Sequence, residues 1–434
     1  MKKYKIVILV CVFTILGIFT CRVSKTSNVY EENENNQMKK QVNTISMMLE
    51  TEAGSGKYEM TTRDSWPTEG YVFNSTLSKC ENGGELSWDD TNKKVLMSGN
   101  ISDKCYVYFD IETKVFLADY VKSLYTGTQG DNNIYYHDSS LENGAGDNSY
   151  RYAGSSETTN NYVCFGSDAD TCPEDNLYRI IGVFDGKVKL IKSTGTTNTL
   201  LGTDGTYTSN SRSYAWTDLD SCPSTTAYKF DNNVVVLSNK NILGAVPDGG
   251  KSGCNMWKYS NLNSVNLNTN FITNLGIKWA ALVDNATWKV SGYSTANVTA
   301  KTMYTAEITN ATKTYGPSDG TSKIGLMYAS DYGFAASPSA WTTLLSSYND
   351  SSIKSTNWIY NAGMEWTMTP YSSDSYSVFI LSYVSTVSNT GNLGTWSSLG
   401  AAAGFGTRPA MYLNASVVYT RGSGTASDPI RIEI

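Results

Sequence analysis

The chain has 434 residues, of which 12% are aromatic, and it carries a formal net charge of −6. A chain of this length can form more than one domain. Its negative charge disfavours binding to nucleic acid, because attraction between basic side chains and phosphates supplies most of the non-specific affinity for nucleic acid. We therefore expect no nucleic-acid partner.

The N-terminus has the pattern of a targeting segment. Three lysines precede an apolar run over residues 6–20, which is as long as a signal-peptide core and shorter than a full membrane span of about 20 residues. We expect residues 1–27 to be an uncleaved signal anchor, and the alternatives are cleavage or lipidation at Cys21. Because lysines precede the run and acids follow it, the positive-inside rule places the rest of the chain outside the cell, on its surface.

Beyond this segment the chain has six cysteines. An even number of cysteines in an exported chain predicts disulfides. Pairing in sequential order keeps each loop inside one local unit, whereas no CxxC or Cys/His spacing indicates zinc. The expected disulfides are Cys80–Cys105, Cys164–Cys172 and Cys222–Cys254.

Composition divides the remainder into modules. Residues 28–44 are polar and charged, which predicts a stalk. Short alternating segments separated by turn residues predict a small disulfide-stapled β-sandwich over 45–112. Residues 113–148 predict a short helix and then a linker, because helical apolar spacing gives way to Gly, Asn and Asp. The last module, 149–434, is expected to be strand-rich, and the whole chain is expected to be α+β.

Several elements of the last module can be predicted from local pattern. Asp-Gly between two alternating strands predicts a hairpin over 177–192. Residues 258–292 predict one or two helices followed by a strand, and 324–332 predict a strand that runs into a helix or turn. Further strands are predicted at 364–370 and 404–413.

The segment between these last two strands is rich in Ser, Tyr, Asn, Thr and Gly. Such composition is typical of binding loops, in which rigid aromatic side chains anchor a ligand and small polar side chains adapt to it. The alternative is a strand-and-turn region without a ligand. The candidate ligand-binding residues are Tyr371, Asp374, Tyr376, Tyr383 and Trp396.

Two parts of the chain resemble known bacterial surface proteins. In the first part, Leu86-Ser87-Trp88-Asp89 follows a cysteine and a glycine-rich gap, and it precedes Cys105-Tyr106-Val107-Tyr108-Phe109-Asp110. This order resembles an N-terminal module, about 70 residues long, of predicted surface proteins from uncultured Firmicutes.

The second part carries, in order, Leu-Tyr-Arg-Ile-Ile-Gly-Val, Trp-Lys-Val-Ser-Gly, Gly-Leu-Met-Tyr-Ala-Ser-Asp, Trp-Thr-Met-Thr-Pro and Arg-Pro-Ala-Met-Tyr-Leu. These segments resemble bacterial surface domains of the DUF6273 type. Those domains are similar to the C-type-lectin-like fold shared by formylglycine-generating enzymes and the variable proteins of diversity-generating retroelements. The resemblance implies a C-type-lectin-like domain over 149–434.

The resemblance does not extend to the functional residues of those proteins. The Glu-Pro-Asn, Gln-Pro-Asp and Trp-Asn-Asp motifs of calcium-dependent lectins do not occur in the chain. No cysteine follows Cys254, so the reactive cysteines of formylglycine-generating enzymes have no counterpart. Fold similarity alone therefore assigns no activity.

Few residues point to catalysis or to a metal. The only histidine, His137, lies in the expected linker, which disfavours Ser–His and Cys–His mechanisms. Glu365 and Asp374 are the pair to check for carboxylate-pair hydrolysis, although Glu365 is expected either to pair with a basic residue or to lie on a solvated strand face. Arg408 is expected to contact a carboxylate or carbonyl. No cofactor is expected; the alternative is calcium at Asp168 and Asp170, in an oxygen-rich loop that lacks EF-hand spacing.

Together these features predict a membrane-anchored adhesion or recognition protein of the cell surface. We expect it to bind a surface glycan or a protein ligand without catalysis. The alternatives are a carbohydrate-active or formylglycine-generating-like enzyme and a structural protein of the envelope.

Overall fold

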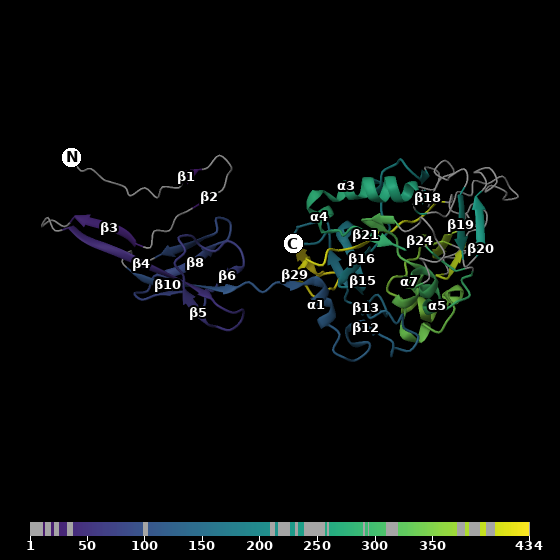
Figure 1. Cartoon of the computed structure of the whole chain (residues 1–434), viewed down its shortest axis with the longest axis horizontal. Coiled ribbons are helices and arrows are strands. Elements are labelled where there is room, and N and C mark those ends of the chain that lie inside the picture. The colour runs from purple at the N-terminus through teal and green to yellow at the C-terminus, as the bar shows by residue number, and fades with distance from the viewer. Residues whose placement is uncertain are drawn as a thin grey trace. The chain divides into compact units, whose positions relative to one another are not determined.

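The computed structural model describes residues 12–13, 19–20, 26–32, 38–98, 103–208, 213–215, 226–230, 233–237, 257, 260–289, 291–293, 295–309, 320–370, 378–381, 391–395 and 404–433. The chain divides into a smaller unit, Met1–Lys114, and a larger unit, Val115–Ile434 (Figure 1). Strands build both units and helices are added in the larger one, which confirms the expected strand-rich α+β class. Among the described residues, no helix combines the length and the apolar character needed to cross a membrane.

The smaller unit contains a six-stranded sheet in which β4 and β10 run parallel at the centre. Its path is β3–β4–β10–β6, with β5 paired to β4 and β7 paired to β10, and β8 and β9 form a separate ribbon. The bounds are β3 (Thr26–Glu32), β4 (Met38–Glu50), β5 (Tyr58–Met60), β6 (Tyr71–Phe73), β7 (Lys79–Cys80), β8 (Glu85–Asp89), β9 (Lys94–Ser98) and β10 (Lys104–Ile111).

The core of this unit follows the two-residue period of β10. Cys105, Val107 and Phe109 are buried, and Met47 and Leu49 of β4 join them. Alternate side chains of a strand point to the same face of the sheet, so one face of β10 is apolar throughout.

The structure corrects the expected stalk over 28–44. In that range β3 and β4 pair as antiparallel strands, in a register from Thr26↔Thr44 to Glu32↔Met38. The polar composition did not indicate these strands, because the hydrogen bonds between paired strands join backbone groups and need no apolar side chains. Before them lies a shorter antiparallel pair, β1 (Val12–Phe13) with β2 (Phe19–Thr20).

The larger unit is organised around a seven-stranded antiparallel sheet. Its path is β12–β13–β15–β16–β28–β23, and β14 pairs with β15. The bounds are β12 (Ile134–His137), β13 (Ser149–Tyr152), β14 (Tyr162–Cys164), β15 (Leu177–Phe184), β16 (Lys187–Lys192), β23 (Ile324–Gly325) and β28 (Ala410–Tyr412).

The predicted hairpin is confirmed with its turn. β15 and β16 are joined by Asp185 and Gly186, whose φ angles are 47° and 76°. Two positive φ angles define the tight turn whose twist matches that of the flanking strands.

The helices predicted over 258–292 are also present. A π-helical segment, Leu262–Phe271, continues into α3 (Ile272–Leu275) and α4 (Ile277–Leu282), and the strand β21 (Ala286–Trp288) follows. α5 (Ala300–Tyr304) packs against α7 (Ala329–Ala335), which follows β23 as predicted (Figure 1). Further described elements are α2 (Asn198–Leu201), β17 (Tyr207–Thr208), β18 (Ser213–Ala215), β19 (Thr226–Phe230), β20 (Asn233–Leu237), β22 (Gly320–Ser322), α8 (Ser351–Ser355), β24 (Glu365–Pro370), β25 (Val378–Leu381), β26 (Leu393–Thr395) and β27 (Gly404–Phe405).

Residues 113–148 are not the expected helix and linker between domains. The helix is present as α1 (Leu117–Ser123), but the stretch after it supplies β12, which pairs with β13 inside the central sheet. Gly and Asn there form the turns on either side of a short buried strand, with positive φ at Asn133 and Asn148. The larger unit therefore begins at Val115 and not near residue 149.

The first strand of the larger unit lies in one three-stranded sheet with its last two strands. β11 (Val115–Phe116) pairs with β29 (Val418–Arg421), which pairs with β30 (Arg431–Glu433). Tyr120 of α1 stacks on Tyr419 of β29 with ring centroids 3.7 Å apart.

Two of the three predicted disulfides are confirmed. Cys80–Cys105 has an S–S distance of 2.00 Å, and Cys164–Cys172 one of 2.06 Å. Cys222 and Cys254 lie outside the described residues, so their pairing stays a prediction.

We expect peptide mapping of the oxidised protein, without reduction, to recover a Cys222–Cys254 crosslink beside the other two. Once Cys80–Cys105 and Cys164–Cys172 have formed, Cys222 and Cys254 are the only two cysteines left beyond the N-terminal segment. The measurement is mass spectrometry of the digest, with a reduced sample as control. Free thiols at both positions in the exported protein would contradict the prediction.

Candidate functional site

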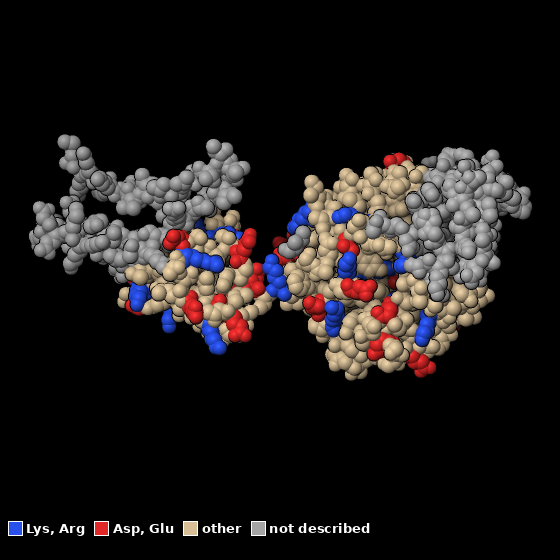
Figure 2. All heavy atoms as spheres, in the orientation of Figure 1, with Lys and Arg blue, Asp and Glu red and all other residues tan. Residues whose placement is uncertain are grey.

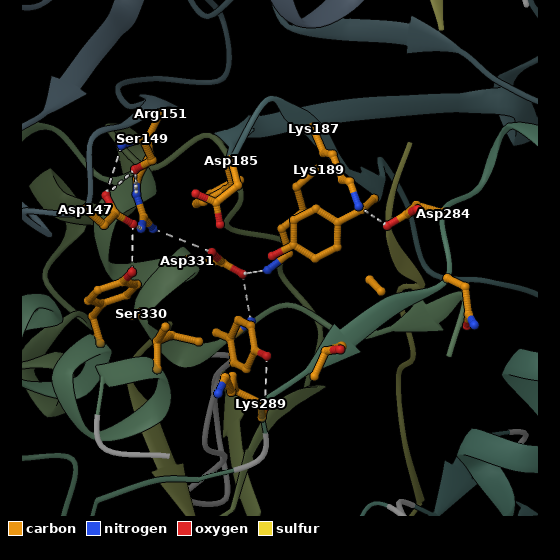
Figure 3. A pocket seen from close by; sticks show the side chains of 18 residues that line it. Asp147, Ser149, Arg151, Asp185, Lys187, Lys189, Asp284, Lys289, Ser330 and Asp331 are labelled. Atoms are coloured by element: carbon orange, nitrogen blue, oxygen red, sulfur yellow. Dashed lines mark hydrogen bonds and ion pairs between the residues drawn. The ribbon is translucent and has the colours of Figure 1, made fainter. Parts of the chain in front are cut away.

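A cavity of about 390 Å³ lies over one face of the central sheet in the larger unit (Figure 3). Strands β13, β15, β16 and β28 provide its floor, and α7 and β21 provide residues of its walls. This volume is at the small end of the usual range for small-molecule sites, about 300–1,000 Å³. On the face shown in Figure 2, red and blue spheres lie next to one another in the larger unit.

The floor of the cavity contains a row of paired residues that crosses four strands. Arg151 of β13 lies opposite Gly182 of β15, Gly182 lies opposite Lys189 of β16, and Lys189 lies opposite Tyr412 of β28. Residues directly opposite in a sheet share a face, so Arg151, Lys189 and Tyr412 all line the cavity. Gly182 is required in this row because a Cβ there would lie 2.2 Å from the Tyr150 carbonyl oxygen.

Each buried cation in the floor has a carboxylate partner. Arg151 donates from Nη2 to Asp147 Oδ2 at 2.6 Å, and its Nε donates to Ser149 Oγ at 2.8 Å. Lys189 Nζ donates to Asp331 Oδ2 at 2.6 Å. The side chains of Arg151 and Lys189 are only 2% and 1% exposed, so these pairs are what makes their burial tolerable.

Aromatic rings surround the same cations. Lys189 Nζ lies 4.4 Å from the ring centroid of Tyr328 and 5.4 Å from that of Tyr412. Arg151 Cζ lies 4.7 Å from the centroid of Phe184. A cation over the face of a ring is attracted by the ring quadrupole, and this attraction grows when water is excluded.

Asp331 reaches the floor because of its place at the start of α7. Its Oδ2 accepts a hydrogen bond of 2.9 Å from the backbone N–H of Tyr328, and this bond caps the helix. Its other oxygen, Oδ1, faces Arg151 Nη1 at 3.8 Å, which is longer than a hydrogen bond.

Ser330 is next to Asp331 and also lines the cavity. The residue is fully buried, and its side chain interacts with the buried Glu307 carboxyl, whose pKa this interaction lowers. Its backbone N–H donates to the Glu307 carboxylate at 3.3 Å.

The outer wall carries a more exposed pair. Lys187 Nζ lies 2.6 Å from Asp284 Oδ2, and the two side chains are 40% and 20% exposed. Asp185, at the tip of the β15–β16 turn, points its carboxylate toward Asp331 in the view of Figure 3.

Burial and pairing set the protonation of these groups. Burial alone would raise the pKa of Asp147, but Arg151 and the hydrogen bonds from Ser149 and Tyr304 hold that pKa below its ordinary value. Burial lowers the pKa of Lys189, and Asp331 opposes that change.

Glu307 lies behind the cavity wall and does not line it. Its carboxyl is fully buried and contacts the hydroxyl of Thr369. Burial raises the pKa of Glu307 to about 8, against the hydrogen bonds from Ser330 and Thr369.

The five candidate ligand-binding residues predicted from the sequence, Tyr371, Asp374, Tyr376, Tyr383 and Trp396, lie outside the described residues. Their role stays a prediction.

The expected partners of Glu365 and Arg408 are confirmed. Arg408 Nε donates to Glu365 Oε2 at 2.8 Å, and Arg408 Nη2 donates to the Ile359 carbonyl at 2.7 Å. Both side chains are 3% exposed, so this pair belongs to the core.

His137 does not lie in a linker, as its polar neighbours in the sequence suggested. It is fully buried on β12, and its ring centroid lies 5.0 Å from those of Phe334 and Trp341. Its Nδ1 accepts the N–H of Ala145, and burial holds the pKa of His137 well below its ordinary value.

The calcium alternative gains no support from the geometry of its loop. Both carboxylate oxygens of Asp168 lie 2.6 Å from Lys278 Nζ, which neutralises the charge that a cation would need. Asp170 contributes its backbone carbonyl to Arg431 Nη2 at 2.7 Å.

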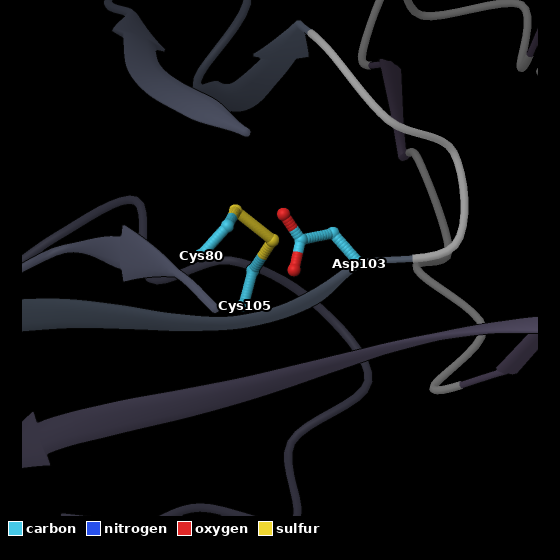
Figure 4. A group of neighbouring side chains, drawn as sticks. All are labelled: Cys80, Asp103 and Cys105. Carbon is cyan, nitrogen blue, oxygen red and sulfur yellow. A yellow bond between two sulfur atoms is a disulfide. The ribbon is translucent and has the colours of Figure 1, made fainter. Parts of the chain in front are cut away.

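Cys80, Asp103 and Cys105 are the one group of potential metal ligands that the described residues bring together (Figure 4). The two sulfur atoms are bonded to each other. Asp103 accepts backbone N–H groups of Asn82 and Gly84 at 2.8 Å and 3.0 Å. These atoms therefore stabilise the loop beside the disulfide and are not available as a ligand set.

The sequence contained one signal for the cavity that pattern analysis passed over. Lys187-Val188-Lys189 carries alternate cations on a strand with neighbours on both sides. A charged residue on a central strand marks either a solvated face or a polar site, and alternation alone does not separate the two.

A scan against protein-family models found no match, and searches of curated proteins and of solved structures also found no similar protein.

Because each buried charge of the Lys189–Asp331 pair needs the other, we expect Lys189→Met and Asp331→Asn each to cost about 3–5 kcal/mol of unfolding free energy. The double variant should cost clearly less than the sum of the two, because it leaves no unpaired charge. Urea denaturation of all three measures this. Asp168→Asn, which breaks the exposed Lys278 pair, is the control and should change stability by less than about 1 kcal/mol. Additive losses would show that the buried pair is not coupled.

The raised pKa of Glu307 predicts a loss of stability with rising pH. Its folded pKa is about 8 and its ordinary value is 4.5, so between these values the folded state binds more protons than the unfolded state. The melting temperature should therefore fall by several degrees more in the wild type than in Glu307→Gln as the pH rises from 5 to 8. Glu157→Gln, an exposed carboxylate of the same unit, is the control and should follow the wild type.

Proposed function

We propose that the chain is a non-catalytic recognition module of the cell surface, which binds a glycan or protein ligand through its larger unit. The observation that carries the proposal is the cavity, whose buried cations and carboxylates hold one another at 2.6 Å on the face of a seven-stranded sheet. Polar groups fixed in this way before a ligand arrives lose little conformational freedom on binding.

The cellular context of the proposal rests on the sequence. A lysine-flanked apolar segment at the N-terminus supports a membrane anchor with the remainder of the chain outside the cell. Disulfides in both units support an oxidising compartment. As part of the same proposal, the smaller unit is a β-sandwich module and the larger unit a C-type-lectin-like domain.

One observation favours hydrolysis as a second candidate function. A carboxyl with a pKa of about 8, such as that of Glu307, has the proton affinity of a general acid. Glu307 nevertheless contacts Ser330 and Thr369 behind the wall and does not line the cavity. A general acid must come within hydrogen-bond reach of the bond that it protonates. Recognition is therefore the better supported of the two functions.

Arrays of glycans and surface proteins, probed with the full chain, test the proposal. We expect saturable capture and no cleavage of the captured ligand. The double variant Lys187→Met/Asp284→Asn, at the cavity wall, should weaken capture at least about threefold, because a ligand loses polar contacts at that wall. The matched control is Lys93→Met/Asp90→Asn, which removes a pair of the same 2.6 Å distance from the smaller unit. Turnover of a hydrolase substrate would support the enzyme alternative, and an absence of saturable capture would support a structural protein.

A further inference from the structure

Resting on the proposed function, we infer that the cavity over β13, β16 and α7 binds an uncharged, hydroxyl-rich group, the terminal sugar of a glycan.

The first reason is the balance of charge in the cavity. Among the described residues, its lining carries four acidic and four basic side chains, Asp147, Asp185, Asp284 and Asp331 with Arg151, Lys187, Lys189 and Lys289. An anionic ligand at Arg151 would meet the carboxylates of Asp147 and Asp331, and a cationic ligand at Asp331 would meet Arg151 and Lys189. Like charges in a poorly solvated site repel strongly. The balance therefore favours a ligand without charge.

The second reason is a pair of polar atoms in the floor that do not bond to each other directly. Arg151 Nη1 and Asp331 Oδ1 are 3.8 Å apart, too far to bond directly. A hydroxyl group placed between them can accept from Nη1 and donate to Oδ1 at the same time. The bonds at 2.6 Å from Arg151 to Asp147 and from Lys189 to Asp331 stay intact, so the ligand need not break an ion pair.

The third reason is the apolar part of the lining. Phe184, Tyr304 and Tyr412 line the cavity beside the polar groups. A sugar ring has both hydroxyls and C–H faces, and its C–H faces pack on aromatic rings while its hydroxyls reach the polar floor. The small volume can hold the terminal sugar of a glycan but not several consecutive sugars.

The test is calorimetric titration of the full chain with three kinds of probe. These are methyl glycosides of neutral hexoses, glucuronic acid and glucosamine, each measured at about 50 and about 500 mM NaCl. We expect a neutral glycoside to bind at least about tenfold more tightly than its charged counterparts. Its affinity should change less than about twofold with salt, because screening acts on charged ligands.

One double variant locates the binding. Lys187→Met/Asp284→Asn removes the polar pair at the cavity wall and should weaken the neutral glycoside at least about threefold. Lys93→Met/Asp90→Asn, which removes a pair of the same 2.6 Å distance from the smaller unit, is the control and should leave that affinity unchanged.

The outcomes separate the ligand class from the function. Tighter binding of glucuronic acid or glucosamine, weakened by the cavity variant, would overturn the neutral ligand and leave recognition standing. Binding of a neutral glycoside that the cavity variant does not change would overturn this site. No saturable binding of any probe, together with no capture on the arrays, would overturn both proposals.

Discussion

The central sheet of the larger unit presents two cations, Arg151 and Lys189, on a face that the protein buries, and the architecture around them follows from the need to neutralise them. Asp147 comes from the turn just before β13, whereas Asp331 comes from α7, 142 residues beyond Lys189. Because a buried unpaired charge costs several kcal/mol, the start of α7 has to lie over the middle of the sheet. The cavity is the space that remains beside these pairs, and its polar character is therefore built into the fold.

The same carboxylate also shapes the helix. Asp331 Oδ2 accepts both the Tyr328 N–H that begins α7 and the ammonium of Lys189. One carboxylate oxygen therefore both begins α7 and neutralises Lys189 of the sheet. A shift of the helix would disturb the ion pair, and a shift of the ion pair would disturb the helix. The groups are therefore fixed in place, which supports the proposed recognition function over a reaction in which they would have to change charge or move.

Features set by neighbouring residues could be predicted from the sequence. Asp185-Gly186 fixed the β15–β16 turn, the even cysteine count and short spacings gave two disulfides, and Arg408 found a carboxylate as expected. The cavity could not be predicted, because its lining runs from Asp147 to Tyr412 and meets only through long-range pairing. Polar composition was misleading in two places, at the strand β3 and at His137, since a hydrogen-bonded strand or a buried ring can lie among polar and turn-forming residues. The predicted binding segment around Tyr376 and Trp396 lies outside the described residues and stays a prediction.

The stacking of Tyr120 on Tyr419, together with the β11–β29 pairing, brings the entry and the exit of the chain to one place in the larger unit. A unit with adjacent ends can be spliced into a loop of another protein, or can have its ends joined and be opened elsewhere, with little distortion. The topology of the sheet thus favours insertion or circular permutation of the whole unit. Its cavity is formed by β13, β15, β16, β28 and α7, with neither β11 nor β29 in its lining, so it would be carried along intact.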